Sequence, residues 1–323
     1  MGERVSMKHL DKSLFFLLVL GLSVSMPARA GLEEGLAAFK AGNHAAGLRE
    51  ILPLAKKGDP KAQYLLGILY YAGRGVPQDY RLAAKWYRKA AEQGHVAAQI
   101  DLGFMYANGL GVSKDSEKAV EWFRKAAEQG DPDAQFNLAL MYENGTGVPQ
   151  DYGKAAQWYR KAADQGSVDA LFNLGLMHYR GQGVPRDYDK ASEQFHRLAE
   201  KGYSDAQVML GMMYLAGQGV TQDYKKAVEW LRKAAEQGNV RAQALLGAMY
   251  QEGKGVPKDR VIAYALYNLS ATSEPALDGV IGGRKAVSEE MTPYQIEAGQ
   301  ELTRELMKPG NFLKALDAAT GAR

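Results

Sequence analysis

Residues 58–93 read GDPKAQYLLGILYYAGRGVPQDYRLAAKWYRKAAEQ, and this stretch decides the fold because the chain repeats it. Six such 36-residue units run from residue 58 to residue 273 of the 323-residue chain. We call the residues at one place in successive repeats a column. Glycine fills the columns that begin at Gly58, Gly73 and Gly75, and it fills the column of Gly67 except at Ala139. A fixed period of this length indicates a repeat array, so most of the 36 glycines reflect architecture rather than disorder.

The first half of each repeat has the pattern of a helix. Ala62, Leu66, Leu69 and Tyr70 are spaced i, i+4, i+7 and i+8, which places them on one helix face. The dipeptide at 59–60, Asp followed by Pro, is typical of an N-cap and a first helical position. The sequence therefore predicts a first helix that begins near residue 60.

The second half predicts another helix, which begins after the glycine loop. Asp79 is a candidate N-cap, Ala83 and Trp86 lie on the apolar face, and Gly94 is a candidate for positive φ at the helix end. One helix pair cannot bury its apolar face alone, so we expect the repeats to stack. We also expect aromatic residues, including the tryptophan column, to fill the space between helices. This column holds Trp86, Trp122, Trp158 and Trp230.

Three motifs together resemble the Sel-1-like repeat, a branch of the tetratricopeptide superfamily. They are Ala-Gln-x-x-Leu-Gly-x-Met-Tyr, Gly-x-Gly-Val-Pro-x-Asp and Tyr-x-x-Ala-x-x-Trp-Tyr-Arg-Lys-Ala-Ala, and the resemblance covers residues 58–273. It implies an all-α fold, a right-handed α-solenoid of helix-turn-helix repeats that acts as an adaptor or scaffold. Exported bacterial members are similar to proteins that regulate signalling or mediate contact with other cells.

The N-terminal residues have the pattern of a secretory signal peptide. Lys8 and Lys12 precede an apolar stretch at 14–22, and the small-residue site Ala28-Arg29-Ala30 follows. This order predicts a signal peptide at 1–30, export to the periplasm or beyond, and no stable membrane anchor after cleavage. The apolar stretch is shorter than the roughly 20 residues that span a bilayer.

The flanks of the repeats predict capping units. Residues 31–57 have the pattern of a shorter helix pair with Asn43 as a candidate cap, and residues 274–308 that of a degenerate final pair. Thr292 and Gln295 suggest a capping box there. We expect residues 309–323 to form a frayed tail.

The composition argues against several classes of function. The formal net charge is only +3, which gives no electrostatic case for nucleic acid. The chain has no cysteine, so thiolate metal sites and cysteine nucleophiles are excluded. Histidine spacing suggests no zinc site, and we expect no cofactor and no enzymatic activity. Cysteine-rich relatives of the resembled family have been linked to β-lactamase activity, so a cell-wall or β-lactam hydrolase is the alternative.

The expected function is binding of a protein or peptide by a monomer. By analogy with the tetratricopeptide fold, in which first helices line the concave surface, we expect four columns to face the partner. They begin at Lys61, Tyr64, Ile68 and Tyr71; the second and third are apolar, and the first holds three aspartates. The alternative is that the apolar columns are core between repeats, and that the acids stabilise helix N-termini. The candidate residues are Tyr64, Ile68, Ile100, Phe104, Asp133, Phe136, Leu140, Asp169, Phe172, Leu176, Tyr179 and Met212.

Repeat four differs from the others at several columns at once. Coupled swaps of large for small residues indicate repacking, and the alternative is a central site where partner contact overrides the consensus. The substituted residues are Leu171, His178, Gln194, His196 and Leu198.

Overall fold

The computed structural model describes residues 26–273 and 280–321. Helices make up 75% of the described residues, which form 17 helices and no strand. The all-α prediction of helix-turn-helix repeats is therefore confirmed. Most of the predicted signal peptide, residues 1–25, lies outside the described residues, and residues 26–30 begin the first described helix.

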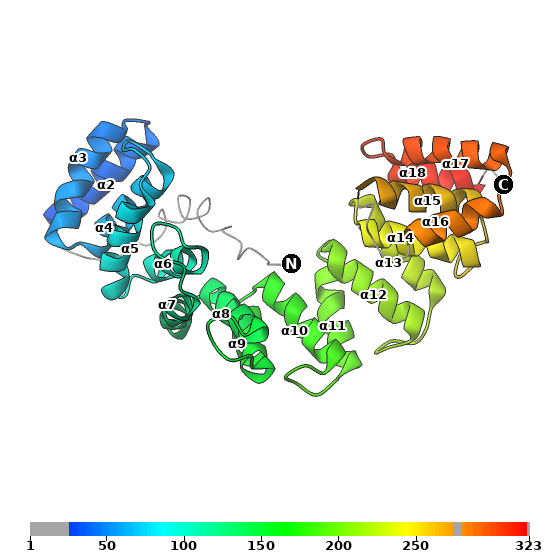
Figure 1. Ribbon diagram of the computed structural model, residues 1–323, viewed down its shortest axis with the longest axis horizontal. Helices are drawn as coiled ribbons and strands as arrows, with labels where there is room; N and C mark the ends of the chain where they lie inside the picture. The colour runs from blue at the N-terminus through cyan, green and yellow to red at the C-terminus, as the bar shows by residue number, and fades with distance from the viewer. Residues whose placement is uncertain (1–25, 274–279, 322–323) are drawn as a thin grey trace. The chain divides into compact units, whose positions relative to one another are not determined.

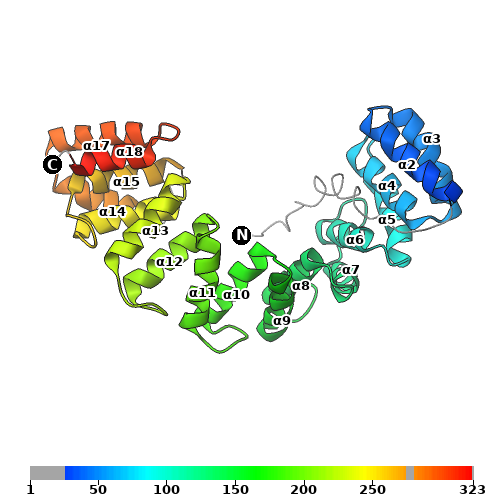
Figure 2. The same ribbon diagram turned by 180° about the vertical axis from the view of Figure 1, so that it is seen from behind.

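The chain divides into two compact units, Met1–Ala170 and Leu171–Arg323, called unit 1 and unit 2. In unit 1, each helix packs against the next one along the chain (Figure 1; the reverse side is seen in Figure 2). The first pair, α2 and α3, includes residues 31–57, for which a capping helix pair was predicted, but α2 begins earlier, at Met26. The helices are α2 (Met26–Lys40), α3 (His44–Lys57), α4 (Pro60–Ala72), α5 (Tyr80–Glu92), α6 (Val96–Asn108), α7 (Ser116–Glu128), α8 (Pro132–Asn144) and α9 (Tyr152–Asp164).

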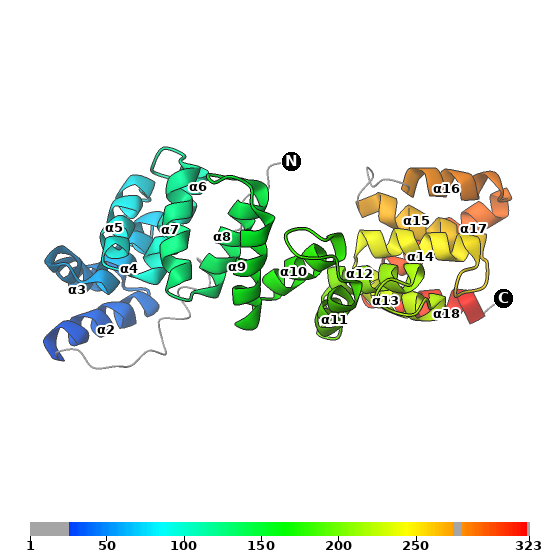
Figure 3. The same ribbon diagram turned by 90° about the horizontal axis from the view of Figure 1, so that it is seen from below.

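Unit 2 continues the repeat pattern and ends in three further helices. Helix α16 lies against α15 (Figure 3), while α17 packs on α15 and α18 packs on α17 and α13. The helices are α10 (Val168–Arg180), α11 (Tyr188–Ala199), α12 (Ser204–Ala216), α13 (Tyr224–Glu236), α14 (Val240–Glu252), α15 (Arg260–Ser273), α16 (Val280–Glu289), α17 (Pro293–Leu306) and α18 (Phe312–Gly321). The first three residues of α10 belong to unit 1.

The helix ends follow the predicted capping chemistry. The Asp59 carboxylate accepts a hydrogen bond from the Ala62 N–H at 2.8 Å, and Asp79 accepts from the Leu82 N–H at 3.0 Å. Asn43 caps α3 in the same way, at 3.2 Å from the Ala46 nitrogen. Thr292 opens α17 with the predicted capping box. These side chains satisfy N–H groups that have no partner within the helix.

The glycine columns have two structural roles. Gly73 ends α4 at φ 67°, a left-handed conformation that side chains disfavour. Gly67 is different, because a Cβ atom there would lie 2.4 Å from the Tyr87 ring, so glycine lets α5 pack closely on α4. At Gly111 the obstacle is the preceding repeat, since a Cβ would lie 2.1 Å from the Tyr80 carbonyl oxygen.

A glutamine column joins consecutive repeats. The Gln99 amide nitrogen donates to the Ala91 carbonyl of the preceding repeat at 3.1 Å, and Gln129 donates to the Gln99 side-chain oxygen at 2.8 Å. The same pair of bonds recurs around Gln63, Gln135 and Gln207. These amides satisfy buried carbonyls at the ends of second helices, which fixes the register between neighbours. In repeat four the two glutamine columns hold Leu171 and Lys201 instead.

Two expectations need correction. The tryptophans are half-buried rather than core residues. The amino group of the lysine three positions later lies over each ring; for example, the Lys161 nitrogen is 4.0 Å from the Trp158 ring centroid. Most of the expected tail, residues 312–321, is the helix α18. Its buried Phe312, Ala315 and Leu316 are spaced i, i+3 and i+4, so burial of one apolar face orders the segment.

Candidate partner-binding surfaces

In unit 1, four of the expected contact residues lie in the core. Tyr64 and Ile68 of α4 and Ile100 and Phe104 of α6 are only 2–4% exposed. The Phe104 ring meets the Phe123 ring edge-on, with centroids 5.1 Å apart. Side chains with so little exposed area offer a partner almost nothing to cover, which fits the alternative of a core between helices.

Further along unit 1 the same columns are more open. Phe136 and Leu140 of α8 are half-buried. The Phe136 ring lies 5.7 Å from the Tyr159 ring, so one side of it belongs to the core. These two side chains combine a fixed orientation with remaining apolar surface, as interface residues often do.

In unit 2 the remaining apolar candidates are half-buried as well. Phe172, Leu176 and Tyr179 lie on α10 and Met212 lies on α12. The Tyr179 hydroxyl donates to the Gln218 side-chain oxygen at 2.6 Å. Burial, and secondarily the nearby Tyr188, raises the pKa of Tyr179, so the hydroxyl remains a neutral donor. The structure therefore holds its ring in one place.

The acidic candidates lie where a helix N-terminus favours negative charge. Asp133 and Asp169 occupy the first turns of α8 and α10, and Asp169 is exposed. In the same column Asp205 accepts a hydrogen bond from Asn239 at 2.9 Å. These positions agree with the helix-stability alternative.

A buried polar cluster in unit 1 was not expected from the sequence. Asp101 is 5% exposed, and its charge raises the pKa of Tyr87, for which burial is the larger cause. Burial also raises the pKa of Tyr71, with smaller contributions from Tyr80 and Asp101. The hydroxyls of both tyrosines therefore stay protonated at neutral pH. The sequence does contain one sign of this cluster: Asp101 stands in a column that holds leucine, asparagine or methionine in the other repeats.

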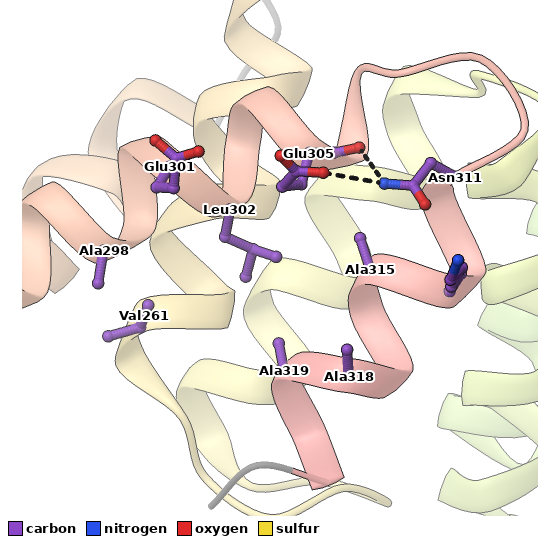
Figure 4. A pocket seen from close by; sticks show the side chains of 10 residues that line it. Val261, Ala298, Glu301, Leu302, Glu305, Asn311, Ala315, Ala318 and Ala319 are labelled. Carbon is purple, nitrogen blue, oxygen red and sulfur yellow. Dashed lines mark hydrogen bonds between the residues drawn. The ribbon is translucent and has the colours of Figure 1, made fainter.

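An open pocket of about 520 Å³ lies between α15, α17 and α18 of unit 2 (Figure 4). The wall of the pocket is mostly apolar. The Asn311 side-chain nitrogen donates to the Glu305 backbone oxygen at 3.0 Å and to the Glu305 carboxylate at 3.2 Å. No residue of the pocket was singled out from the sequence, because α18 was not expected. The lining residues are Val261, Ala298, Glu301, Leu302, Glu305, Asn311, Lys314, Ala315, Ala318 and Ala319.

Two kinds of feature are not found in the parts of the chain that the structure describes. Among residues 26–273 and 280–321, no group of three or more histidine, aspartate or glutamate side chains is placed to hold a metal ion. No helix within these ranges is long and apolar enough to span a membrane.

Comparison with known proteins agrees with the repeat geometry. The Sel1 repeat model matches six consecutive segments, at 60–95, 96–131, 132–167, 168–203, 204–239 and 240–274. A solved Sel1 repeat protein from Oxalobacter formigenes is 33% identical, and the match covers 74% of this chain and 96% of that one with a TM-score of 0.64. A search of curated proteins gave no match.

Two other solved structures are similar. The C-terminal part of a TPR repeat-containing protein from Cytophaga hutchinsonii is 17% identical over 78% of this chain and 98% of that one, with a TM-score of 0.50, which shows the fold alone. A protective antigen from uropathogenic Escherichia coli is 25% identical over 100% of this chain and 98% of that one, with a TM-score of 0.49. Because the family model matches six successive segments with the spacing of the helix pairs, the chain belongs to the Sel1 repeat family.

Proposed function

We propose that this protein is a scaffold that binds a protein or peptide partner along the first helices of its repeats. The observation that carries the proposal is the uninterrupted series of six Sel1 repeats. Sel1 repeat proteins generally act as protein-interaction scaffolds. Stacked helix pairs suit this role because they present the same columns of side chains at regular intervals.

The half-buried apolar residues of α10 and α12 are the proposed contact surface in unit 2. Phe172, Leu176, Tyr179 and Met212 are oriented by the core and still have apolar area that a partner can cover. Phe136 and Leu140 play the same part in unit 1. The buried Tyr64, Ile68, Ile100 and Phe104 support the fold instead.

A photo-crosslinking amino acid at Leu176 tests the proposed surface. The full-length protein is produced in its own host, irradiated in cells and analysed for covalent adducts. We expect a defined adduct from position 176 and none from Glu229, an exposed residue on the second helix α13 of the same unit. Equal adducts at both positions, or none at position 176, would overturn the proposed contact surface.

Substitution then measures the contribution of the contact. Phe172→Ala and Met212→Ala are expected to weaken binding of the captured partner by about 1–2 kcal/mol each, since truncated interface residues commonly cost this much. The melting temperature of each variant is measured in parallel. Unchanged affinity with reduced thermal stability would assign both residues to the core.

Export is part of the proposal, and the pattern around Lys8, Lys12 and Ala28-Arg29-Ala30 supports it. We expect the exported protein to start at Gly31, to remain unanchored and to be a monomer. N-terminal mass analysis after cell fractionation, followed by light scattering, checks all three points. A chain that keeps residues 1–30 in the cytoplasmic fraction would contradict export.

We propose binding rather than catalysis. The sequence lacks the cysteines of its cysteine-rich relatives, which weakens the alternative of a cell-wall or β-lactam hydrolase. A turnover assay with peptidoglycan and with a chromogenic β-lactam separates the two functions. Multiple turnovers by the purified protein would favour the hydrolase.

A further inference from the structure

His95 occupies a helix-capping position that most other repeats fill with a side-chain oxygen, whereas Tyr203 of the fifth repeat makes no side-chain cap. Asp59, Asp131 and Asn239 cap α4, α8 and α14 through such an oxygen. In the second repeat the His95 Nδ1 atom accepts the hydrogen bond from the Ala98 N–H, at 3.3 Å. A ring nitrogen accepts only when it carries no proton, so this cap exists only while the imidazole is neutral.

The same ring also joins the second repeat to the first. It stacks on Tyr64 of α4, with ring centroids 4.5 Å apart and an angle of 30° between the planes. Tyr64 is 2% exposed and packs in turn on Tyr87 of α5. One imidazole therefore both begins α6 and contacts the core of the preceding helix pair.

The surroundings of His95 disfavour a positive charge. Burial is the largest cause and Lys61 the next, and together they lower the pKa of His95 from 6.5 to about 4, although a backbone hydrogen bond and Asp59 act in the opposite direction. The N-terminus of α6 adds to this, because the positive end of a helix dipole repels a cation. The charged groups facing the ring from α4 and its cap are thus Lys61 and Asp59.

We propose that His95 is an acid-sensitive joint between the first two repeats. Protonation of the ring removes the α6 cap and places a positive charge at a site where burial disfavours it, so the start of α6 and its contact with Tyr64 open locally in mild acid. Helix α14 carries an asparagine cap and remains closed under the same conditions. A binding surface that includes α6 would then release its partner at low pH, a consequence that rests on the proposed function.

The direction of the pH effect follows from proton binding. The opened or unfolded form binds a proton with the ordinary pKa of 6.5, and the closed form only near 4. The contribution of the neutral ring to closure is therefore fully present above pH 6.5 and is progressively lost as the pH falls toward 4. Between pH 7 and pH 5 the equilibrium constant for closure is expected to fall roughly 20-fold.

Hydrogen exchange and NMR titration of the whole protein test the joint. We expect the first amides of α6 to lose about 20-fold in protection between pH 7 and pH 5, after correction for intrinsic exchange, whereas those of α14 change little. The variant His95→Asn, which restores the cap used in α14, is expected to abolish this difference. In Lys61→Gln, which removes an exposed charge, the pKa of His95 is expected to rise.

Two results would overturn the proposal. One is the same loss of α6 protection in His95→Asn, which would assign the pH effect to other groups. The other is a measured pKa near 6.5 for His95 in the intact protein, which would show that the closed form does not favour the neutral ring. Both measurements are independent of partner binding, so they fail or succeed separately from the scaffold function.

Discussion

At the scale of single residues, the unusual side chains of repeat four compensate one another. His178 and Gln194 replace the tyrosine and tryptophan of other repeats, and their Nδ1 and Oε1 atoms are 3.0 Å apart. His196 takes the place of arginine, and its Nε2 atom lies 3.2 Å from the Tyr214 hydroxyl, where Arg124 meets Tyr142 in an earlier repeat. Partly buried contacts between neighbouring side chains thus account for the changes at His178, Gln194 and His196, which supports repacking over a partner site.

Gly67→Ala tests the close packing of the first and second helices. The added Cβ would lie 2.4 Å from the Tyr87 ring, so we expect a loss of about 1–3 kcal/mol in the free energy of unfolding. Urea denaturation measures it. Gly282→Ala is the control, because a Cβ in that helix meets no atom within 4 Å and improves helix propensity. Equal effects at the two sites would contradict the packing argument.

Gln99→Leu tests the glutamine column. The change removes the bonds to Ala91 and Gln129 and leaves a buried carbonyl without a partner, so we expect a cost of about 1–3 kcal/mol. Gln129→Ala alone removes one of the bonds. In the double variant the effects should be less than additive, because both single changes remove the same amide contact. Strict additivity in thermal unfolding would argue against a coupled pair.

At the scale of elements, burial of an apolar face decides whether the terminal segment is ordered. Helix α18 packs on α17 and α13 and buries Phe312, Ala315 and Leu316, and Arg232 of α13 forms an ion pair with Asp317. Asp317 is largely exposed, so the ion pair contributes little, and the apolar contacts hold the helix. Capping motifs alone did not reveal this, because α18 lacks the glycine loop of a repeat.

Leu316→Ala is expected to detach α18. Leu316 is fully buried, and its truncation costs about 2–5 kcal/mol in a packed core, enough to release a helix held on one side. Trypsin should then cleave at Lys314 at least tenfold faster. Ala318→Ser, on the exposed side of α18, is the control. Cleavage at the same rate in both variants would show that other contacts hold the helix.

At the scale of the whole molecule, each repeat is stabilised by its neighbours. Long-range contacts within each unit join successive helices, apart from those of the C-terminal capping helices. Stability in such an array is approximately the sum of repeat and interface terms. A local defect should therefore affect nearby repeats most. We expect the loss of stability to stay largely within the unit that contains the defect.

A pair of matched substitutions measures that locality. Leu102 in unit 1 and Leu246 in unit 2 belong to the same column, and both are 0% exposed. Each change to alanine should cost about 2–5 kcal/mol. By hydrogen exchange, Leu102→Ala should weaken protection mainly in α4–α9, and Leu246→Ala mainly in α12–α17. Uniform loss along the chain in both variants would show one cooperative unit instead.

The sequence by itself determined the family, the helix pairs and their caps. It could do so because the 36-residue period repeats the aspartate cap of the second helix and three glycine columns six times, and these local requirements do not depend on distant contacts. Asn43 and the Thr292 capping box lie outside the repeats and were predictable from the local capping pattern alone.

Only the tertiary structure decided which apolar residues are core. Tyr64 and Phe172 belong to one column, yet the first is buried and the second half-buried, because the exposed area of each depends on side chains from other helices. The same holds for α18, which is ordered by the helices it packs against, and for His95, whose cap is visible in sequence but whose stack on Tyr64 is not. Local chemistry fixes where helices begin and end, whereas burial is a property of the packed array.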